Sequence, residues 1–349
     1  MPEMELYGGF LTKIRADHES GVNRADCFVG RHLKARESSV ATGVTSGRGL
    51  TACGGWLRDT LLAYSAGSVL EAGSDTTSSS IISCVMFMLR YPLVLEKVRQ
   101  SISASYEYKG LTCTFRNKAR EEIDRVVGKD RLPTFEDEKN LHYIVAIVKE
   151  VLRCRPPLPL GKTPHYLLLS YQLKTPSSYL GVPHRSTEDT IYNGYLIPKG
   201  SLVFGNVWAL HLDPSRFESP MEFNPDRWML DCTLQSDGSK SGKKRDHFSF
   251  GWGRRFCIGS HIAEGSLFIA IARIIWGFNL YGPKDSSTGA TQVPDPWDED
   301  NFSSGVAMSA LPFNVAFEVR SFKHEEVIEN AFRDAQEHWD ISGLARDKR

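Results

Sequence analysis

Residues 248–264 read FSFGWGRRFCIGSHIAE, and this stretch decides how the rest of the chain is interpreted. It fits the pattern F-x-x-G-x-R-x-C-x-G at Phe250, Gly253, Arg255, Cys257 and Gly259. The glycines predict a bent loop that presents Cys257 at the start of a helix expected from about Cys257 to Phe278. Backbone N–H groups and the helix dipole at such a place favour a thiolate over a thiol. We therefore expect Cys257 to be a metal ligand or a nucleophile.

The surroundings of Cys257 favour the metal. No His, Asn or Asp is spaced near it as in a cysteine hydrolase, and Arg255 is well placed to pair with an anionic group on a cofactor. The glycines allow the backbone to approach a flat macrocycle and to hydrogen-bond the sulfur. The competing interpretation is a buried free cysteine in an ordinary loop, which is the commonest fate of a lone cysteine.

Three further motifs precede this loop in the sequence. They are AGSDTT at 72–77, Glu150 with Arg153 three residues later, and FNPDRW at 223–228. Taken singly each is weak, because an i,i+3 Glu–Arg pair is usually a surface ion pair and a helical Thr usually bonds to a main-chain carbonyl. Taken together and in this order, they resemble the [AG]-G-x-[DE]-T-T, E-x-x-R and F-x-P-x-R-F/W elements of the cytochrome P450 family. Residues 141–161 and 182–201 are also similar to fungal members, particularly the O-methylsterigmatocystin oxidoreductase-like group.

The resemblance implies the fold. We expect a mainly α protein with a small β component, corresponding to the C-terminal portion of the cytochrome P450 fold: the long I helix, the K helix, the Cys-ligand loop, the L helix and short strands. Residues 1–322 would form a partial, N-terminally truncated domain, followed by a charged C-terminal tail at 323–349. Three stretches are interpreted as insertions or retained introns: 38–55, 100–120 and 162–181.

The sequence pattern also predicts individual elements. A long, largely buried helix should follow residue 59 and end at Pro92, and an amphipathic helix should run from Asp137 to Leu152. β-Branched and aromatic residues predict strands in Ile191–Leu196 and Leu202–Leu210, with short strands again in Phe313–Val319.

The resemblance also implies a role for each site residue. Cys257 would bind the iron of haem b, inside a loop shaped by Phe250, Gly253 and Gly259. Arg255 and His184 would bind the haem propionates. Thr76 and Asp75 would be catalytic, delivering protons from the long helix. Glu150, Arg153 and Arg227 would be structural, forming a buried charge network that locks the Cys loop against the core.

The activity implied is that of a haem-thiolate monooxygenase, which inserts one oxygen atom from O2 into a lipophilic small molecule. The setting would be fungal secondary or xenobiotic metabolism, and NADPH-cytochrome P450 reductase would be the partner that supplies electrons. Two alternatives stay open. One is a truncated or mis-spliced fragment without catalytic activity. The other is a non-enzymatic haem-binding protein, which would need Cys257 but neither Thr76 nor Asp75.

Composition narrows the class of protein. The 42 Lys and Arg balance the 42 Asp and Glu, so the chain lacks the positive charge of a nucleic-acid binder. Seven cysteines without a C-x-x-C pair argue against a disulfide framework or a zinc cluster. Full-length family members are anchored at the cytosolic face of the endoplasmic reticulum membrane. No apolar run in this chain is long enough to span a bilayer, so the chain alone is expected to be cytoplasmic or soluble.

Overall fold

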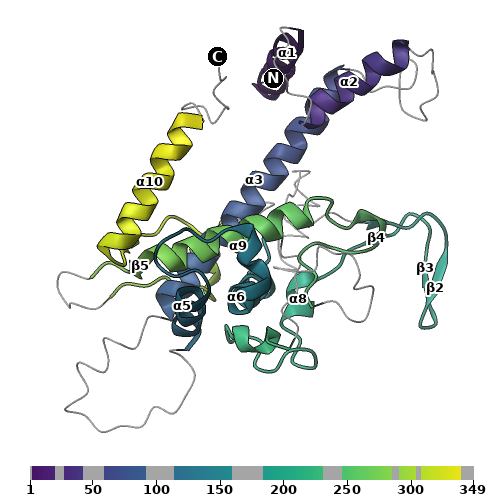
Figure 1. Cartoon of the computed structure of the whole chain (residues 1–349). Coiled ribbons are helices and arrows are strands. Elements are labelled where there is room, and N and C mark those ends of the chain that lie inside the picture. The colour runs from purple at the N-terminus through teal and green to yellow at the C-terminus, as the bar shows by residue number, and fades with distance from the viewer. Residues whose placement is uncertain are drawn as a thin grey trace, which may run out of the picture. The chain divides into compact units, whose positions relative to one another are not determined.

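The structure, a computed structural model, describes residues 2–19, 27–41, 59–91, 114–158, 184–230, 246–284, 291–303 and 308–338 (Figure 1). The chain divides into two compact units, residues 1–75 and 76–349. Helix α3 (Asp59–Arg90) contributes its first half to one unit and its second half to the other. No helix in the described ranges is sufficiently long and apolar to cross a membrane.

The first unit is made of helices. It contains α1 (Pro2–Glu19), α2 (Phe28–Ala41) and the first half of α3. Its small apolar core consists of Leu11, Val29, Leu33, Leu62 and Ala63. Asp59, at the start of α3, pairs with Arg15 at 2.6 Å and with Arg36 at 3.0 Å. One carboxylate therefore joins all three helices.

The second unit is built around a buried helix, α6 (His142–Cys154). Every residue of α6 after His142 is buried, and the helix packs against α5 (Thr114–Val126) and α9 (Ser260–Gly277). The second half of α3 adds Phe87 and its apolar neighbours to the same core. Helices of this core carry residues of the candidate functional site. The remaining helical elements are α8 (Val207–His211), α10 (Phe322–His338) and short 3₁₀ turns at Phe135–Asn140, Pro225–Trp228, Gly253–Arg255 and Glu299–Asn301.

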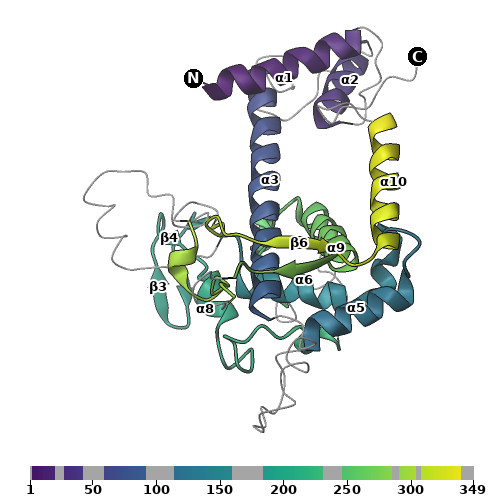
Figure 2. The same cartoon turned by 90° about the vertical axis from the view of Figure 1, so that its left-hand side faces the viewer.

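The strands in the described residues form three two-stranded antiparallel ribbons, and two isolated antiparallel bridges join Lys284 to Thr291 and Phe302 to Ala310. The ribbons pair β1 (His184–Arg185) with β4 (Leu202–Val203), β2 (Thr190–Tyr192) with β3 (Tyr195–Ile197), and β5 (Phe278–Tyr281) with β6 (Ala316–Val319) (Figure 2). The β2–β3 hairpin turns at Asn193 and Gly194, whose φ angles are 50° and 83°. Asn-Gly is the pair that tolerates two successive positive φ angles in a two-residue turn.

The expected fold class, mainly α with short strands, is confirmed. Helix α3 ends at Arg90, two residues before Pro92, and the strand predicted in Ile191–Leu196 is the β2–β3 hairpin. The helix predicted over Asp137–Leu152 is two elements, because the 3₁₀ turn at 135–140 ends at Leu141 and α6 begins at the next residue. The predicted strand Leu202–Leu210 was wrong beyond Val203, because the side chain of Asn206 caps helix α8 there.

Two further expectations meet the structure only in part. The segment predicted as a charged tail, 323–349, is helical up to His338 as part of α10. Within the predicted insertion 100–120, residues 114–120 form the first half of α5, and Ala119 is fully buried in the core. Residues 38–41 of the first insertion end α2, and 162–181 lie outside the described residues. That these stretches are insertions stays a prediction.

Candidate functional site

The Cys loop, residues 246–259, is held in its bent shape by its own backbone. The N–H of Gly251 donates to the carbonyl of Phe248, and the N–H of Cys257 donates to the carbonyl of Phe250, both at 2.9 Å. Gly251 and Gly253 have φ angles of 70° and 62°, a region that side chains with a Cβ rarely occupy. The loop therefore needs these two glycines whether or not a ligand is present.

The thiol of Cys257 is free and exposed at the end of this loop. Helix α9 begins three residues later, with Gly259 at its N-cap. Gly259 has a φ of −94°, so its backbone does not itself demand glycine. A methyl group added at Gly253 or Gly259 would meet no protein atom within 4 Å. Open space therefore lies beside the backbone on both sides of Cys257.

A pocket of 320 Å³ joins Cys257 to segments that are far apart in the sequence. Its wall comes from α3, the end of α6, strand β1, the residues before α8, the Cys loop and α9. The predicted site residues that line it are Thr76, His184, Phe250, Arg255 and Cys257. Gly253 and Gly259 do not line it themselves, and neither does Asp75, whose side chain is exposed. Five of the eight residues predicted to bind the cofactor or catalyse the reaction are thus brought together.

Part of the pocket wall consists of stacked rings. The imidazole of His184 lies parallel to the indole of Trp252, with ring centroids 6.3 Å apart and planes 14° apart. Gly205 faces the same indole, and a methyl group there would overlap the Trp252 ring. Glycine at 205 is therefore what leaves room for Trp252 against this wall. Neither Trp252 nor Gly205 was singled out from the sequence.

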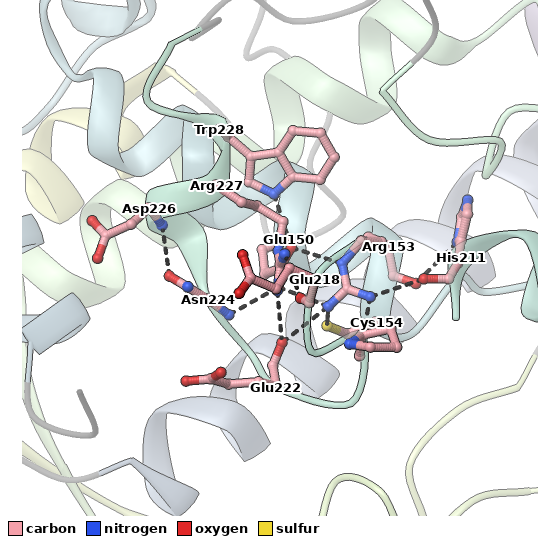
Figure 3. Close-up of polar contacts among 11 residues, drawn as sticks. Glu150, Arg153, Cys154, His211, Glu218, Glu222, Asn224, Asp226, Arg227 and Trp228 are labelled. Atoms are coloured by element: carbon pink, nitrogen blue, oxygen red, sulfur yellow. Dashed lines mark hydrogen bonds and ion pairs between the residues drawn. The ribbon is translucent and has the colours of Figure 1, made fainter. Parts of the chain in front are cut away.

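The predicted charge network is present, and its Glu150–Arg153 pair is completely buried. Arg153 donates from Nε and Nη2 to the two carboxylate oxygens of Glu150 at 2.9 and 2.8 Å, and both side chains have no exposed surface (Figure 3). Arg227 adds a third member, donating from Nε to Glu150 at 3.1 Å. Two uncharged donors complete the carboxylate shell: the indole N–H of Trp228 at 2.8 Å and the backbone N–H of Asn224 at 2.8 Å.

This network binds the segment 211–228 directly, rather than the Cys loop. Arg153 donates to the backbone carbonyls of His211, Pro220 and Glu222 at 2.8 to 3.0 Å. In the described part of the chain, the side chains of Glu150, Arg153 and Arg227 form no hydrogen bond with residues 246–259. The expectation that the network itself locks the Cys loop therefore needs a correction: any link must pass through other residues.

Three residues supply that link between α6 and the Cys loop. Lys149, buried on α6, forms an ion pair with Asp246 at 2.7 Å. The hydroxyl of Ser249 donates to the carbonyl of Leu152 at 2.7 Å. His211 lies between Arg153 and Phe248 and bonds to both. Most of these bonds end on backbone groups, which leave no mark in a sequence pattern.

Comparison with known proteins identifies the family. A family model described as Cytochrome P450 matches residues 114–174 and 172–295, which together are more than half of the chain. The chain belongs to the cytochrome P450 family. Cytochrome P450 monooxygenase 79 of Postia placenta is 40% identical over the whole of this chain and 55% of its own length. Cytochrome P450 monooxygenase verL of Clonostachys rogersoniana is 38% identical over 96% of this chain and 51% of its own length.

The fold agrees with that of a solved cytochrome P450. A zebra fish cytochrome P450, whose structure was determined with progesterone, superposes with a TM-score of 0.54 at 23% identity, covering 81% of this chain and 50% of that one. The chain spans about half the length of the curated P450 relatives that it matches. The expected fungal family resemblance is therefore confirmed, whereas the more specific O-methylsterigmatocystin-like group stays a prediction.

Proposed function

We propose that this chain carries the haem-thiolate site of a fungal cytochrome P450 monooxygenase, with Cys257 as the ligand of haem b. The single observation that carries the proposal is that the exposed Cys257 thiol and Thr76 of α3 line the same pocket. Haem bound through a cysteine thiolate supplies the chemistry that activates O2 for insertion of one oxygen atom into an organic substrate.

The residues present suit a haem. Haem iron in a haem-thiolate protein is held by one cysteine thiolate, and the free, exposed Cys257 would supply it. Arg255 and His184 line the same pocket and would bind the two propionates, Arg255 through charge-assisted hydrogen bonds. The open space beside Gly253 and Gly259 would let a flat ring approach the backbone closely.

Thr76 would hold and pass a proton at its Oγ1, with Asp75 as the exposed carboxylate that exchanges protons with water. Support comes from the position of Thr76 on the pocket wall, one residue after Asp75 on α3. Overall, inserting one atom of O2 into a substrate consumes two electrons and two protons and releases water. We propose that an NADPH-dependent reductase supplies the electrons and that the substrate is a lipophilic small molecule of secondary or xenobiotic metabolism.

The full protein would work at the cytosolic face of the endoplasmic reticulum membrane, as the family resemblance suggests. The apolar part of the pocket wall, which includes Val207, Phe248, Ala263 and Leu267, supports a lipophilic substrate.

A spectrum tests haem ligation. The purified full chain is supplied with haem, reduced and exposed to carbon monoxide, and we expect the red-shifted Soret band of thiolate ligation. Cys257→Ser should abolish this band, whereas Cys27→Ser, which removes the other exposed free thiol of the described residues, should leave it intact. A folded chain without the band, or a band that survives Cys257→Ser, would refute the proposal.

The role of Thr76 has its own test. Thr76→Ala should keep the thiolate band but lower the oxidation of an alkoxycoumarin probe per NADPH consumed by about tenfold or more, because the proton-passing hydroxyl is lost. Ser78→Ala, an exposed hydroxyl on the same helix, is the matched control and should leave this ratio unchanged. An unchanged ratio in Thr76→Ala would contradict the proton-transfer role.

A further inference from the structure

His211 joins two parts of the molecule that the charge network alone does not connect. It is the last residue of α8, and its side chain has no exposed surface. On one side, Nδ1 of its ring lies 2.9 Å from the carbonyl oxygen of Arg153, at the end of α6. On the other side, the backbone N–H of Phe248, in the Cys loop, lies 2.7 Å from Nε2.

The two partners dictate the protonation of the ring. A carbonyl oxygen can only accept and a backbone N–H can only donate, so Nδ1 must carry the proton and Nε2 must be bare. This is the neutral Nδ1–H form of histidine. Burial lowers the pKa of His211 to about 3, assisted by the charges of Arg153 and Arg216 and opposed by the bond to the Arg153 carbonyl. The form required by the geometry is therefore the form expected at neutral pH.

The bond on the α6 side is reciprocal. Arg153 Nη1 donates to the backbone carbonyl of His211 at 3.0 Å, while the ring of His211 donates to the backbone carbonyl of Arg153. The guanidinium that pairs with Glu150 thus fixes the backbone of His211 directly. Because the backbone of His211 is fixed at this point, its ring has a defined position from which to accept the Phe248 N–H.

The bond on the loop side lies at the base of the turn that presents Cys257. The carbonyl of Phe248 accepts the N–H of Gly251, and the carbonyl of Phe250 accepts the N–H of Cys257. The phenyl ring of Phe248 also stacks against the imidazole of His211, with planes 26° apart and centroids separated by 6.3 Å. Holding the N–H of Phe248 therefore helps to fix the residue whose own carbonyl accepts the Gly251 N–H. The peptide group between Phe250 and Gly251 in turn holds the N–H of Cys257.

We propose that His211 is a positioning residue that connects the buried Glu150–Arg153 pair to the Cys loop. Its Nδ1–H donates to the backbone carbonyl of Arg153, and its Nε2 accepts the backbone N–H of Phe248. This inference rests on the proposed haem ligation for its functional meaning. The link itself is a property of the polypeptide and is measured without haem.

The test uses two substitutions that each keep half of the link. Asn resembles histidine at Nδ1, so His211→Asn retains a donor for the Arg153 carbonyl but loses the acceptor for Phe248. Gln resembles histidine at Nε2, so His211→Gln retains an acceptor for the Phe248 N–H, and its backbone carbonyl still accepts the bond from Arg153 Nη1 that holds residue 211 in place. His324→Gln is the matched control, because His324 is equally buried but bonds to Ser321 and packs on Trp276, away from the Cys loop.

The first readout is hydrogen–deuterium exchange of the Phe248 amide in the haem-free full chain, resolved by mass spectrometry. We expect protection in the wild type and in His211→Gln and His324→Gln, and exchange roughly fivefold to tenfold faster in His211→Asn, as for loss of one hydrogen bond. An unprotected Phe248 amide in the wild type would overturn the proposal even if a variant failed to fold. Equal protection in His211→Asn and the wild type would also overturn it.

The second readout is the thiolate-type Soret band of the reduced carbon monoxide complex, per bound haem. His211→Asn should lose this band several-fold while His211→Gln and His324→Gln keep it. If His324→Gln loses the band as much as His211→Asn, the effect is one of general stability and the proposal is wrong. If the wild type lacks the band but its Phe248 amide is protected and released by His211→Asn, the link stands and haem ligation by Cys257 fails.

Discussion

At the scale of single residues, the site depends on small groups that no motif contains. Gly205 is the clearest example, because its missing side chain makes room for the indole of Trp252, which in turn stacks on His184. The motif around Cys257 was recognisable because it lies in one continuous stretch. Gly205 and Trp252 meet only after folding, so no sequence spacing relates them.

Gly205→Ala should therefore change haem binding in the pocket more than it changes the overall fold. The added methyl group forces the Trp252 ring away from its place, and overpacking of this kind costs about 1 to 3 kcal/mol. We expect haem affinity to fall about tenfold, which follows from roughly 1.4 kcal/mol of such strain. Near-ultraviolet circular dichroism should report the moved indole.

Gly265→Ala is the control for that substitution. A methyl group at Gly265, on α9, would lie 3.6 Å from Phe135, an ordinary contact distance. Haem affinity and the tryptophan signal should stay as in the wild type. Equal losses of affinity in both variants, or none in Gly205→Ala, would mean that the place of the Trp252 ring does not matter.

His211 should make stability depend on pH in a particular direction. Its pKa is about 3 in the folded chain because of burial, and about 6.5 when the chain is unfolded. Below about pH 6.5 the unfolded chain binds a proton that the folded chain does not, so the free energy of unfolding falls as the pH drops towards 3. The slope from this residue is about 1 kcal/mol per pH unit.

Urea unfolding at about pH 7 and about pH 5 measures this slope. The wild type should lose about 1 to 2 kcal/mol more than His211→Gln over that interval. His32 and His324, whose pKa values burial also lowers, contribute equally to both proteins and cancel in the difference. Identical pH dependence in the two proteins would show that His211 is not held neutral by the fold.

At the scale of elements, α6 is the helix on which the site is mounted. It carries Glu150 and Arg153 for the network, and Lys149 and the Leu152 carbonyl for contacts with the Cys loop. The sequence predicted the buried Glu150–Arg153 pair through the family motif. It did not predict that the pair acts on 211–228, because the acceptors there are backbone carbonyls.

Glu150→Gln should destabilise the chain strongly. It removes the negative charge from a fully buried site that holds Arg153 and Arg227, and breaking such a pair costs about 3 to 5 kcal/mol. Lys323 and Glu326 form a pair with the same i,i+3 spacing, but both side chains are 46% exposed. Urea midpoints should fall sharply in Glu150→Gln and stay unchanged in Glu326→Gln. Comparable midpoints in the two variants would contradict the importance of burial.

Polar side chains that bond to the backbone explain where the predicted elements differ from the structure. Leu202–Leu210 has strand-like composition, yet the strand stops at Val203. The side chain of Asn206 accepts the N–H of Ala209 at 2.9 Å, which caps α8 and starts a helix. Before α6, Asp137 accepts hydrogen bonds from Arg131 and from the backbone N–H of Thr134, which holds the N-terminal end of the separate 3₁₀ turn at 135–140. In both places a polar side chain bonded to the backbone outweighs the apolar pattern.

At the scale of the whole molecule, the order of the motifs predicted more than their individual chemistry. The long α3, the buried α6, the Cys loop and α9 follow one another as the family resemblance required. The packing of these elements places Thr76, His184 and Cys257 around one pocket, although more than 180 residues separate the first from the last. Every residue that lines this pocket belongs to the second unit. The packing of the second unit therefore assembles the site from segments that are far apart in the sequence.

The central claim is that Cys257 binds the haem, and alkylation of Cys257 and Cys27, the exposed thiols in the part of the chain that the structure describes, tests it most directly. Cys257 and Cys27 are both free and exposed, so iodoacetamide should label both in the haem-free chain. When haem is bound, we expect labelling of Cys257 to stop while Cys27 reacts as before, as read by mass spectrometry of the two peptides. Labelling of Cys257 at the same rate with and without bound haem would contradict the account.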